Sequence, residues 1–387
     1  MLIERVLLRP LTVPFRTPVI AGGRRWTGRR LGLVRVSARD GLEGVGEIAL
    51  ETGPALDAPL ASALAVALTG LDLEDGRATA RRLAGLARRI ERDPVVALLA
   101  GGATSTPAAI GRAVRAGAET ALLDLRGLAS GRPVRDLLGT AGRPAVAVNG
   151  LITAVTAEAA VREAAVLAAA GYRCLKLKVG HERTLDELVE RVAAVRSAIG
   201  PEVRLRLDAN GAWSEAGAIR ALRALGGLEL EYVEQPVAPR LGLAALGRVR
   251  HRSPVPIAAD ESVTGPLAGA RLVAERAVDL LVLKPGRVGG PSPALEIAER
   301  AVAQDLGVVV STMFETGIGL ASALHVAAAL PGPDRAHGLG TAELLVSDLL
   351  VGGPRVLNGR LAVPTGPGLG VRLDAAAIER YSSGSGS

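Results

Sequence analysis

The feature that most constrains the fold is a regular alternation of short apolar runs and amphipathic helical segments after Pro144. The runs recur at intervals of roughly 22 to 35 residues, as strands do when each is followed by a helix. This α/β pattern predicts a parallel barrel with helices outside it. An open doubly wound sheet is the alternative, but no GxGxxG follows the first run and no GxxxxGK occurs. The expected strands are VAVNGLI, RCLKLKV, VRLRLDA, LEYVEQP, VPIAADE, DLLVLKP and GVVVSTM.

The N-terminal region follows a different pattern. Strand-like alternation up to about residue 50 carries a hairpin turn at Asp40-Gly41, and the polar residues 15–30 between two of its strands predict a mobile loop. Helical periodicity follows at 57–68, 76–91 and 106–129. We therefore expect an α+β domain at 1–130 and a barrel at 144–350. Residues 355–380 are expected to return to the N-terminal sheet and complete its domain, and 382–387 to form a flexible tail.

Composition argues against several classes of protein. The net charge is +7 and the pI is near 10.3, but the arginines are spread among Asp and Glu without a basic block, so we expect no nucleic-acid partner. The lone Cys174 excludes an internal disulfide and a thiolate metal cluster. No signal peptide and no apolar stretch long enough for a membrane span is found, so the expected location is the cytoplasm.

Lysine is almost absent from this chain. Of 46 lysine and arginine residues, only Lys176, Lys178 and Lys284 are lysines, and all three lie where a predicted strand ends. Lys176 and Lys178 would share one face of their strand and point into the barrel. Charged residues at strand ends can simply be hydrated, but two lysines side by side in a barrel are costly without a counter-charge or a function.

Carboxylates at three successive strand ends supply that counter-charge. Asp208, Glu234 and Asp260 would converge and repel one another unless a cation holds them. An all-oxygen set without clustered His or Cys suits Mg²⁺, with Mn²⁺ as a second option, although salt bridges to arginine would be a simpler account. A lysine can serve as a general base where an arginine cannot, because the guanidinium keeps its proton. The implied chemistry is abstraction of a proton next to a carboxylate, giving an enediolate.

The motifs LKLKVG, RLDANGAW, VEQP, ADES, LKPGRVGG and STMFETGIG, in this order, closely resemble the enolase superfamily in its muconate-lactonizing-enzyme branch. The resemblance covers residues 1–374 and implies a (β/α)7β modified TIM barrel with an α+β capping domain built from both chain ends. It implies that Lys178 and Lys284 are the acid/base residues and that Lys176 tunes Lys178. It also implies that Asp208, Glu234 and Asp260 bind the metal, with Asn210, Gln235 and Glu261 supporting them.

Within this branch, STMFETGIGLASALHVAAALPG and HGLGTAELLVSDLL most resemble o-succinylbenzoate synthases. Such an enzyme performs a syn dehydration in menaquinone synthesis. The alternatives are an N-succinylamino-acid racemase, a dipeptide epimerase and a muconate-type cycloisomerase. Dipeptide epimerases of this branch usually carry Asp-x-Asp after the seventh strand, whereas this chain has Glu315 and then no acid until Asp334, which argues against a substrate with a free amine.

The substrate is expected to be a small carboxylate bound under a lid. The segment from Phe15 to Arg30 is the expected lid, with Gly22 and Gly23 as hinges and arginines suited to a succinyl carboxylate. Family resemblance also suggests a homo-oligomer, either a dimer or an octamer. The candidate substrate-binding residues are Glu315, Thr316, Met313, Trp26, Arg24 and Arg25.

Overall fold

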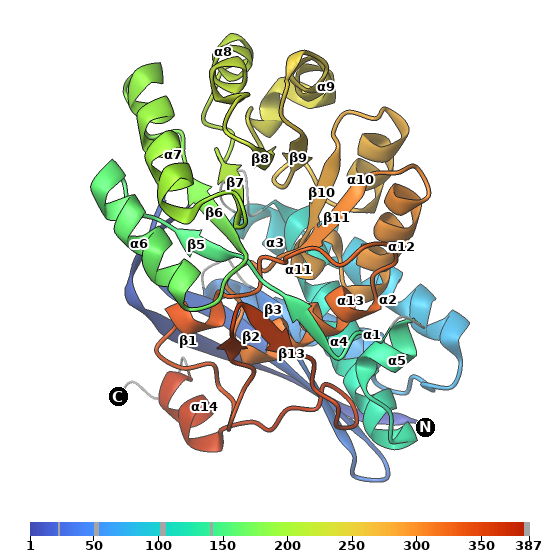
Figure 1. Cartoon of the computed structure of the whole chain (residues 1–387). Coiled ribbons are helices and arrows are strands. Elements are labelled where there is room, and N and C mark those ends of the chain that lie inside the picture. Colours follow the sequence, from blue (N-terminus) through green and yellow to red (C-terminus); the bar gives the residue numbers. More distant parts are fainter. Residues whose placement is uncertain (22–23, 50–53, 101–105, 140–141, 383–387) are drawn as a thin grey trace.

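The N-terminal part is an antiparallel sheet covered by helices. The computed structural model describes residues 1–21, 24–49, 54–100, 106–139 and 142–382. Strands β1 (Ile3–Ala21), β2 (Arg24–Ala38) and β3 (Glu43–Ala49) form the sheet. Its helices are α1 (Asp57–Leu68), α2 (Gly76–Glu91), α3 (Pro94–Leu99) and α4 (Pro107–Ser130), followed by the short α5 (Val134–Leu138) (Figure 1).

Two glycines of β3 let helix α4 lie directly on the sheet. A Cβ on Gly46 would stand 2.0 Å from the Gly117 carbonyl oxygen, and one on Gly44 would stand 2.2 Å from the Ala121 carbonyl oxygen. Residues with side chains would push the helix away. This close packing fixes β3 against α4, so side chains on the other face of β3 have defined positions toward the barrel.

The second part is the parallel barrel. Its sheet runs in the order β11-β10-β9-β8-β7-β6-β5, so each strand lies beside its neighbours in sequence. Each strand falls inside one of the seven expected runs, and the barrel fold is confirmed. The strands are β5 (Gly150–Ile152), β6 (Cys174–Lys178), β7 (Arg204–Asp208), β8 (Leu230–Glu234), β9 (Ile257–Ala259), β10 (Leu280–Leu283) and β11 (Gly307–Val310).

The eighth barrel position is filled by a short bridging segment. His337 forms a parallel bridge with Val148, and Gly338 forms one with Ser311, so this segment joins the last strand to the first. The His337 amide donates to the Ala147 carbonyl at 2.8 Å, and the Gly338 amide donates to the Val310 carbonyl at 2.8 Å. The barrel is therefore closed without a full eighth strand.

Helices cover the outside of the barrel (Figure 1). Three of them begin at a Thr or Ser whose hydroxyl accepts an amide three residues on, at Thr156, Thr184 and Ser214. The helices are α6 (Ala157–Ala169), α7 (Leu185–Ile199), α8 (Glu215–Leu225), α9 (Gly242–Arg252), α10 (Pro266–Ala274), α11 (Pro285–Val288), α12 (Pro291–Val302) and α13 (Gly317–Ala329). No helix in the described ranges is long and apolar enough to cross a membrane.

The C-terminal segment divides between the two parts. Strands β12 (Val356–Leu357) and β13 (Arg360–Ala362) form a small sheet with β4 (Ala145–Ala147) at the start of the barrel, whereas Leu369 packs in a buried cluster with Leu11 and Leu31 of the N-terminal sheet. Helix α14 (Ala375–Tyr381) does pack against β1. Ser382 bridges Leu11, so it is held by β1, while 383–387 lie outside the described residues.

The loop expected at 15–30 is wrong for the described residues, which form strands. Strand β1 continues to Ala21 and β2 starts at Arg24, with Val19 opposite Trp26, so this segment is a long hairpin arm. The pairing is irregular between Pro14 and Val19, where the register shifts. These polar residues form strands because β1 and β2 satisfy each other's backbone hydrogen-bonding groups. The suggested hinges Gly22 and Gly23 lie outside the described residues.

Candidate active site

The lysines and carboxylates gather at the carboxyl-terminal mouth of the barrel. Parallel pairing places Lys178 beside Asp208, and Asp208 beside Glu234, at the ends of three neighbouring strands. Asp260 and Lys284 directly follow β9 and β10. Parallel strands end at the same edge of a sheet, which explains why residues far apart in sequence meet here.

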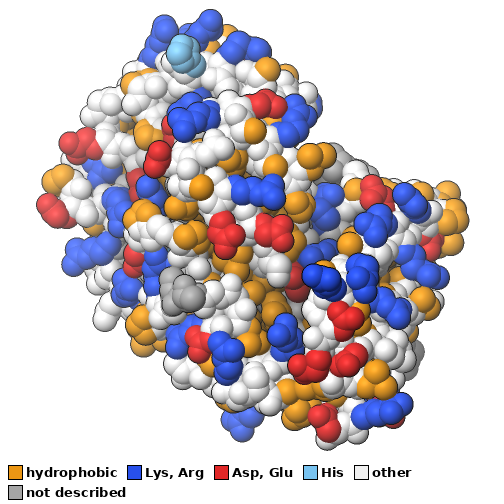
Figure 2. Space-filling view, turned by 90° about the vertical axis from the view of Figure 1, so that its right-hand side faces the viewer, with side chains coloured by type: hydrophobic (Ala, Val, Ile, Leu, Met, Phe, Trp, Pro, Cys, Tyr) orange, Lys and Arg blue, Asp and Glu red, His pale blue; other side chains and the backbone are white. Residues whose placement is uncertain are grey.

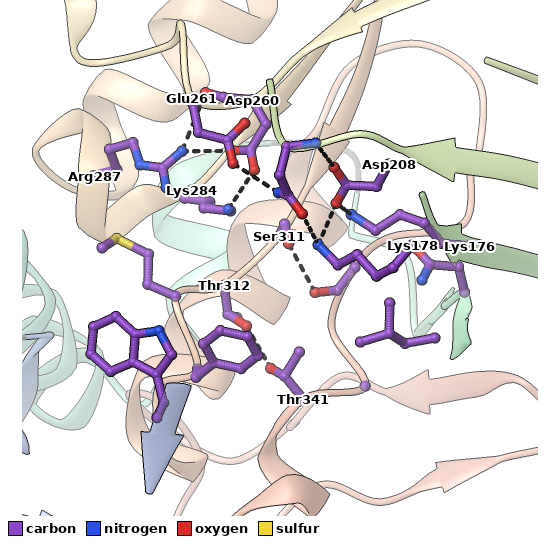
Figure 3. Close-up of a pocket in the computed structure, with 18 of the residues that line it drawn as sticks. Lys176, Lys178, Asp208, Asp260, Glu261, Lys284, Arg287, Ser311, Thr312 and Thr341 are labelled. Atoms are coloured by element: carbon purple, nitrogen blue, oxygen red, sulfur yellow. Dashed lines mark hydrogen bonds and ion pairs between the residues drawn. The ribbon is translucent and has the colours of Figure 1, made fainter. Parts of the chain in front are cut away.

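Strands β6 and β7 supply one side of the site (Figure 3). The Lys176 Nζ lies 2.9 Å from both Asp208 Oδ2 and Glu234 Oε1. The Lys178 Nζ donates to Asp208 Oδ2 at 2.6 Å and to Asn210 Oδ1 at 2.8 Å. Both lysines line the cavity, but Lys176 is buried between two carboxylates, whereas the Lys178 side chain is more exposed.

The opposite side is built on Lys284. Its Nζ donates to Asp260 Oδ2 at 2.6 Å, and Arg287 donates to Asp260 Oδ1 at 2.7 Å. Strand β10 lies four steps from β6 in a barrel of eight positions, so Lys284 and Lys178 face each other across the mouth. Figure 3 shows both ammonium groups directed toward the same space.

Burial and neighbouring charges give the three carboxylates different pKa values. Burial alone would raise the pKa of Asp208 and Asp260, but neighbouring cations outweigh it. Lys176 and Lys178 hold the pKa of Asp208 well below its usual range. Lys284 and Arg287 lower the pKa of Asp260 to about 2. For Glu234, burial and the nearby Asp208 raise the pKa to about 8. The site therefore carries one carboxylate whose charge is not fully compensated.

Two opposing effects act on the pKa of Lys176. Burial lowers this pKa, but Asp208 and Glu234 outweigh burial and raise the pKa well above the ordinary value. Lys176 is consequently a fixed cation between the carboxylates.

Two amide side chains, Asn210 and Gln235, orient the lysine and carboxylate residues of the site. Asn210 accepts from Lys178 and donates through Nδ2 to Glu261 Oε1 at 2.9 Å, so it orients both. Gln235 Oε1 accepts the amides of Asp260 at 3.1 Å and Ser262 at 3.0 Å, which fixes the turn that carries Asp260. Asn210 and Gln235 have φ of 44° and 41°, a left-handed conformation that asparagine tolerates better than most residues.

The donor set fits a hard divalent cation. The three carboxylates offer oxygen ligands on adjacent strands. The negative charge of Glu234 is not fully compensated by the nearby cations, and the buried Glu261 Oε2 has no hydrogen-bond partner. Across the described ranges, no three acidic, His or Cys side chains close around one point, because lysine ammonium groups stand between the carboxylates. Asp208, Glu234 and Asp260 are the residues that would hold the ion.

A cavity of about 180 Å³ opens above these residues. Its opposite wall includes Trp26 and Arg29 from the hairpin arm, together with Thr312 and Phe314 from the loop after β11. Arg29 is only 2% exposed although it comes from the capping part of the chain. The arm therefore closes one side of the barrel mouth.

The substrate-binding candidates divide between wall and core. Trp26 and Met313 line the cavity. Glu315 and Thr316 are buried behind it, where Glu315 accepts the Met313 amide and Thr316 bonds Glu47. Arg25 is exposed away from the lining, and the Arg24 side chain lies outside the described residues.

Sequence reasoning did not single out several lining residues. Arg29, Arg287, Ser311 and Thr341 line the cavity but were not among the candidates. The KPGR motif contains Arg287, three residues after Lys284, and this spacing could have indicated it. Arg29 is one of several arginines in the hairpin arm, and the sequence does not reveal which of them points into the cavity.

The fold and this site define a barrel enzyme with a separate capping part and an acid/base pocket of lysines and carboxylates. The model of the mandelate racemase / muconate lactonizing enzyme N-terminal domain matches residues 5–139, and that of the enolase C-terminal domain-like family matches 159–377. The chain belongs to the enolase superfamily, in its muconate-lactonizing-enzyme branch. The family resemblance of the motifs is thereby confirmed.

Curated relatives in this branch have different activities. An o-succinylbenzoate synthase of Thermobifida fusca is 44% identical over 209 residues, which cover 54% of this chain and 63% of that protein. Muconate cycloisomerase 1 of Pseudomonas putida is 30% identical and covers 90% of both chains. An L-Ala-D/L-Glu epimerase of Clostridium acetobutylicum is 31% identical over 96% of this chain and 99% of that protein.

Solved structures show the same architecture. The muconate lactonizing enzyme of Pseudomonas fluorescens, in complex with muconolactone, superposes with a TM-score of 0.83 at 29% identity, over 98% of this chain and 99% of that one. The L-Ala-D/L-Glu epimerase of Bacillus subtilis gives 0.80 at 28% identity, over 96% and 99%. The relatives are lyases and isomerases, so the comparisons identify an enzyme class and leave the substrate to be argued from the pocket.

Proposed function

We propose that this enzyme is a Mg²⁺-dependent o-succinylbenzoate synthase, which dehydrates 2-succinyl-6-hydroxy-2,4-cyclohexadiene-1-carboxylate. The observation that carries the proposal is the charge of the cavity wall opposite the lysines. The lining residues from β11 onward are Ser311, Thr312, Met313, Phe314, Gly338, Gly340 and Thr341, and none is acidic. A substrate with a free ammonium group would find no carboxylate there, whereas Arg29 offers a cation to a succinyl carboxylate.

The lysines perform the proton transfers. Lys178, as the free amine, removes the proton next to the substrate's ring carboxylate. The resulting ammonium then protonates the departing hydroxyl group on the same face, which leaves as water, so one residue serves both steps of a syn elimination. When bound, Mg²⁺ would supply positive charge to the substrate's carboxylate oxygens. Lys284 remains a cation on the other face, and Asn210 orients Lys178.

Turnover of the cyclohexadiene carboxylate tests the proposal directly. We expect Mg²⁺-dependent loss of its absorbance, and we expect Lys178→Ala to reduce the rate at least about 1,000-fold because the acid and the base are lost together. Arg81→Ala, a change at an exposed cation of helix α2, serves as the control and should retain the rate. Absence of turnover by the unmodified enzyme would refute the assignment.

A racemase of N-succinylated amino acids is the second candidate. It is favoured by Lys178 and Lys284 facing each other, since racemisation needs one proton donor on each face. Exchange of the α-hydrogen for deuterium in N-succinyl amino acids, lost in Lys284→Ala, would support this activity. Oligomeric state, as a dimer or an octamer, also stays a proposal, and light scattering would decide it.

A further inference from the structure

A buried carboxylate of the capping part reaches the start of helix α13, which belongs to the barrel part of the chain. Glu47, on β3, is 6% exposed and accepts three hydrogen bonds at the start of helix α13. The donors are the Thr316 amide at 3.0 Å, the Thr316 hydroxyl at 2.6 Å and the Gly319 amide at 3.0 Å. These partners lie 269 and 272 positions from Glu47 in the chain. A single side chain thus ties the two parts of the chain together.

Helix α13 depends on this carboxylate for its cap. Thr316 occupies the N-cap position, but its side chain makes no capping hydrogen bond within the helix. Its hydroxyl donates to Glu47 instead. A carboxylate at a helix N-terminus also interacts favourably with the helix dipole. Glu47 therefore replaces the local cap that this helix lacks.

The segment held in this way is a wall of the cavity. Ser311, Thr312, Met313 and Phe314 all line it and lead directly into Glu315 and Thr316. Phe314 has a φ of 62°, a strained left-handed conformation that a non-glycine residue keeps only where its surroundings hold it. Phe15 of β1 packs edge to face on Phe314, with ring centroids 5.6 Å apart. Two side chains of the capping part thus contact this segment, Phe15 at Phe314 and Glu47 at Thr316.

We propose that Glu47 is a positioning residue, which sets the substrate-facing wall at 311–316 by capping helix α13 from the capping part of the chain. It touches none of the reacting groups in the proposed mechanism. Its influence passes through Thr316 to Met313 and Phe314, which face the substrate body rather than the α-carbon. We therefore expect its loss to weaken substrate binding more than proton transfer.

The variant Glu47→Gln tests this role, with Asp124→Asn as the matched control. Glutamine has one carbonyl oxygen and an amide group that would face donors, so it cannot accept all three bonds. Asp124 is also a buried carboxylate that accepts two backbone amides, those of Val45 and Leu369, but it contacts no lining residue of the cavity. Both variants should lose stability, and only Glu47→Gln should alter the cavity wall.

Two readouts decide the proposal. Hydrogen–deuterium exchange should accelerate at least about tenfold in residues 312–319 of Glu47→Gln, and Asp124→Asn should leave this segment unchanged. On the dehydration substrate, KM should rise about 10- to 100-fold while kcat changes less than about threefold. The kinetic readout rests on the proposed function, but the exchange readout does not, so it still tests Glu47 if the enzyme acts on another substrate.

A milder variant covers the case in which Glu47→Gln does not fold. Thr316→Val removes the 2.6 Å hydroxyl bond and leaves the carboxylate and both backbone donors in place. It should show the same local acceleration of exchange and the same rise in KM, each to a smaller extent. Unchanged exchange at 312–319 in the folded variants, or a loss confined to kcat, would overturn the proposal.

Discussion

Asp124 offers a test of the domain packing that can be worked from the structure. This residue of α4 is 5% exposed, and its carboxylate accepts the Val45 amide at 2.8 Å and the Leu369 amide at 2.7 Å. It therefore joins α4, β3 and the C-terminal segment. Burial, only partly opposed by the Leu369 and Val45 amides, raises its pKa from 3.8 to about 6.

The raised pKa fixes the sign of a pH effect on stability. The folded state holds the Asp124 proton more tightly than the unfolded state does, so the free energy of unfolding falls as pH rises from about 4 to about 6. The difference between pKa 3.8 and pKa 6 corresponds to a loss of about 3 kcal/mol in the free energy of unfolding. This loss is complete above pH 6 and absent below pH 4.

Urea unfolding of the parent and of Asp124→Asn at several pH values isolates this effect. Asparagine does not titrate, so other groups cancel in the difference between the two proteins, and the altered hydrogen bonding adds a constant offset. Relative to the variant, the parent should lose about 3 kcal/mol between pH 4 and pH 7. A difference that stays flat within about 1 kcal/mol over this range would refute the reasoning.

Three further changes test other parts of the structure. Gly46→Ala should lower the free energy of unfolding in urea by at least about 2 kcal/mol, because the added Cβ would clash with the Gly117 carbonyl. As a control, Gly85→Ala, where no atom lies near the added Cβ, should be neutral or stabilising. Arg29→Leu should raise KM for a succinyl substrate about tenfold, and an unchanged KM would exclude Arg29 as its anchor. Chelation with EDTA should abolish turnover and Mg²⁺ or Mn²⁺ should restore it; full activity without metal would contradict the carboxylate assignment.

The barrel and the lysine-carboxylate cluster were predictable because both follow from local pattern. Each strand carries its own apolar run, and the residues at its end inherit a place at the mouth from the topology alone. Lys178 and Asp260 could therefore be placed together although they are far apart in sequence. The contacts between Lys176, Lys178 and Asp208 required only that neighbouring strands pair in parallel.

The cavity wall was not predictable because it depends on long-range contacts. Arg29 lies opposite Val13 in the regular β1–β2 pairing, and it lines the cavity only because this hairpin packs over the barrel mouth, which no local pattern marks. The role of Glu47 depends on a helix that lacks its own cap and on the seating of β3 against α4. The bridging segment at His337 also escaped the strand pattern, because it lacks an apolar run and is ordered by partners on both sides.

The distribution of the two basic residue types strengthens the assignment of the lysines. This face of the molecule carries its Lys and Arg side chains scattered among Asp and Glu (Figure 2). Arginine also fills buried structural positions: Arg206 is fully buried, donates to Glu231 at 2.6 Å and stacks on Tyr232 at 4.7 Å, and Arg191 is 3% exposed beside Glu182. Burial and ion pairing therefore do not require lysine in this protein. In the proposed mechanism, Lys178 differs from these arginines because it must be able to give up its proton.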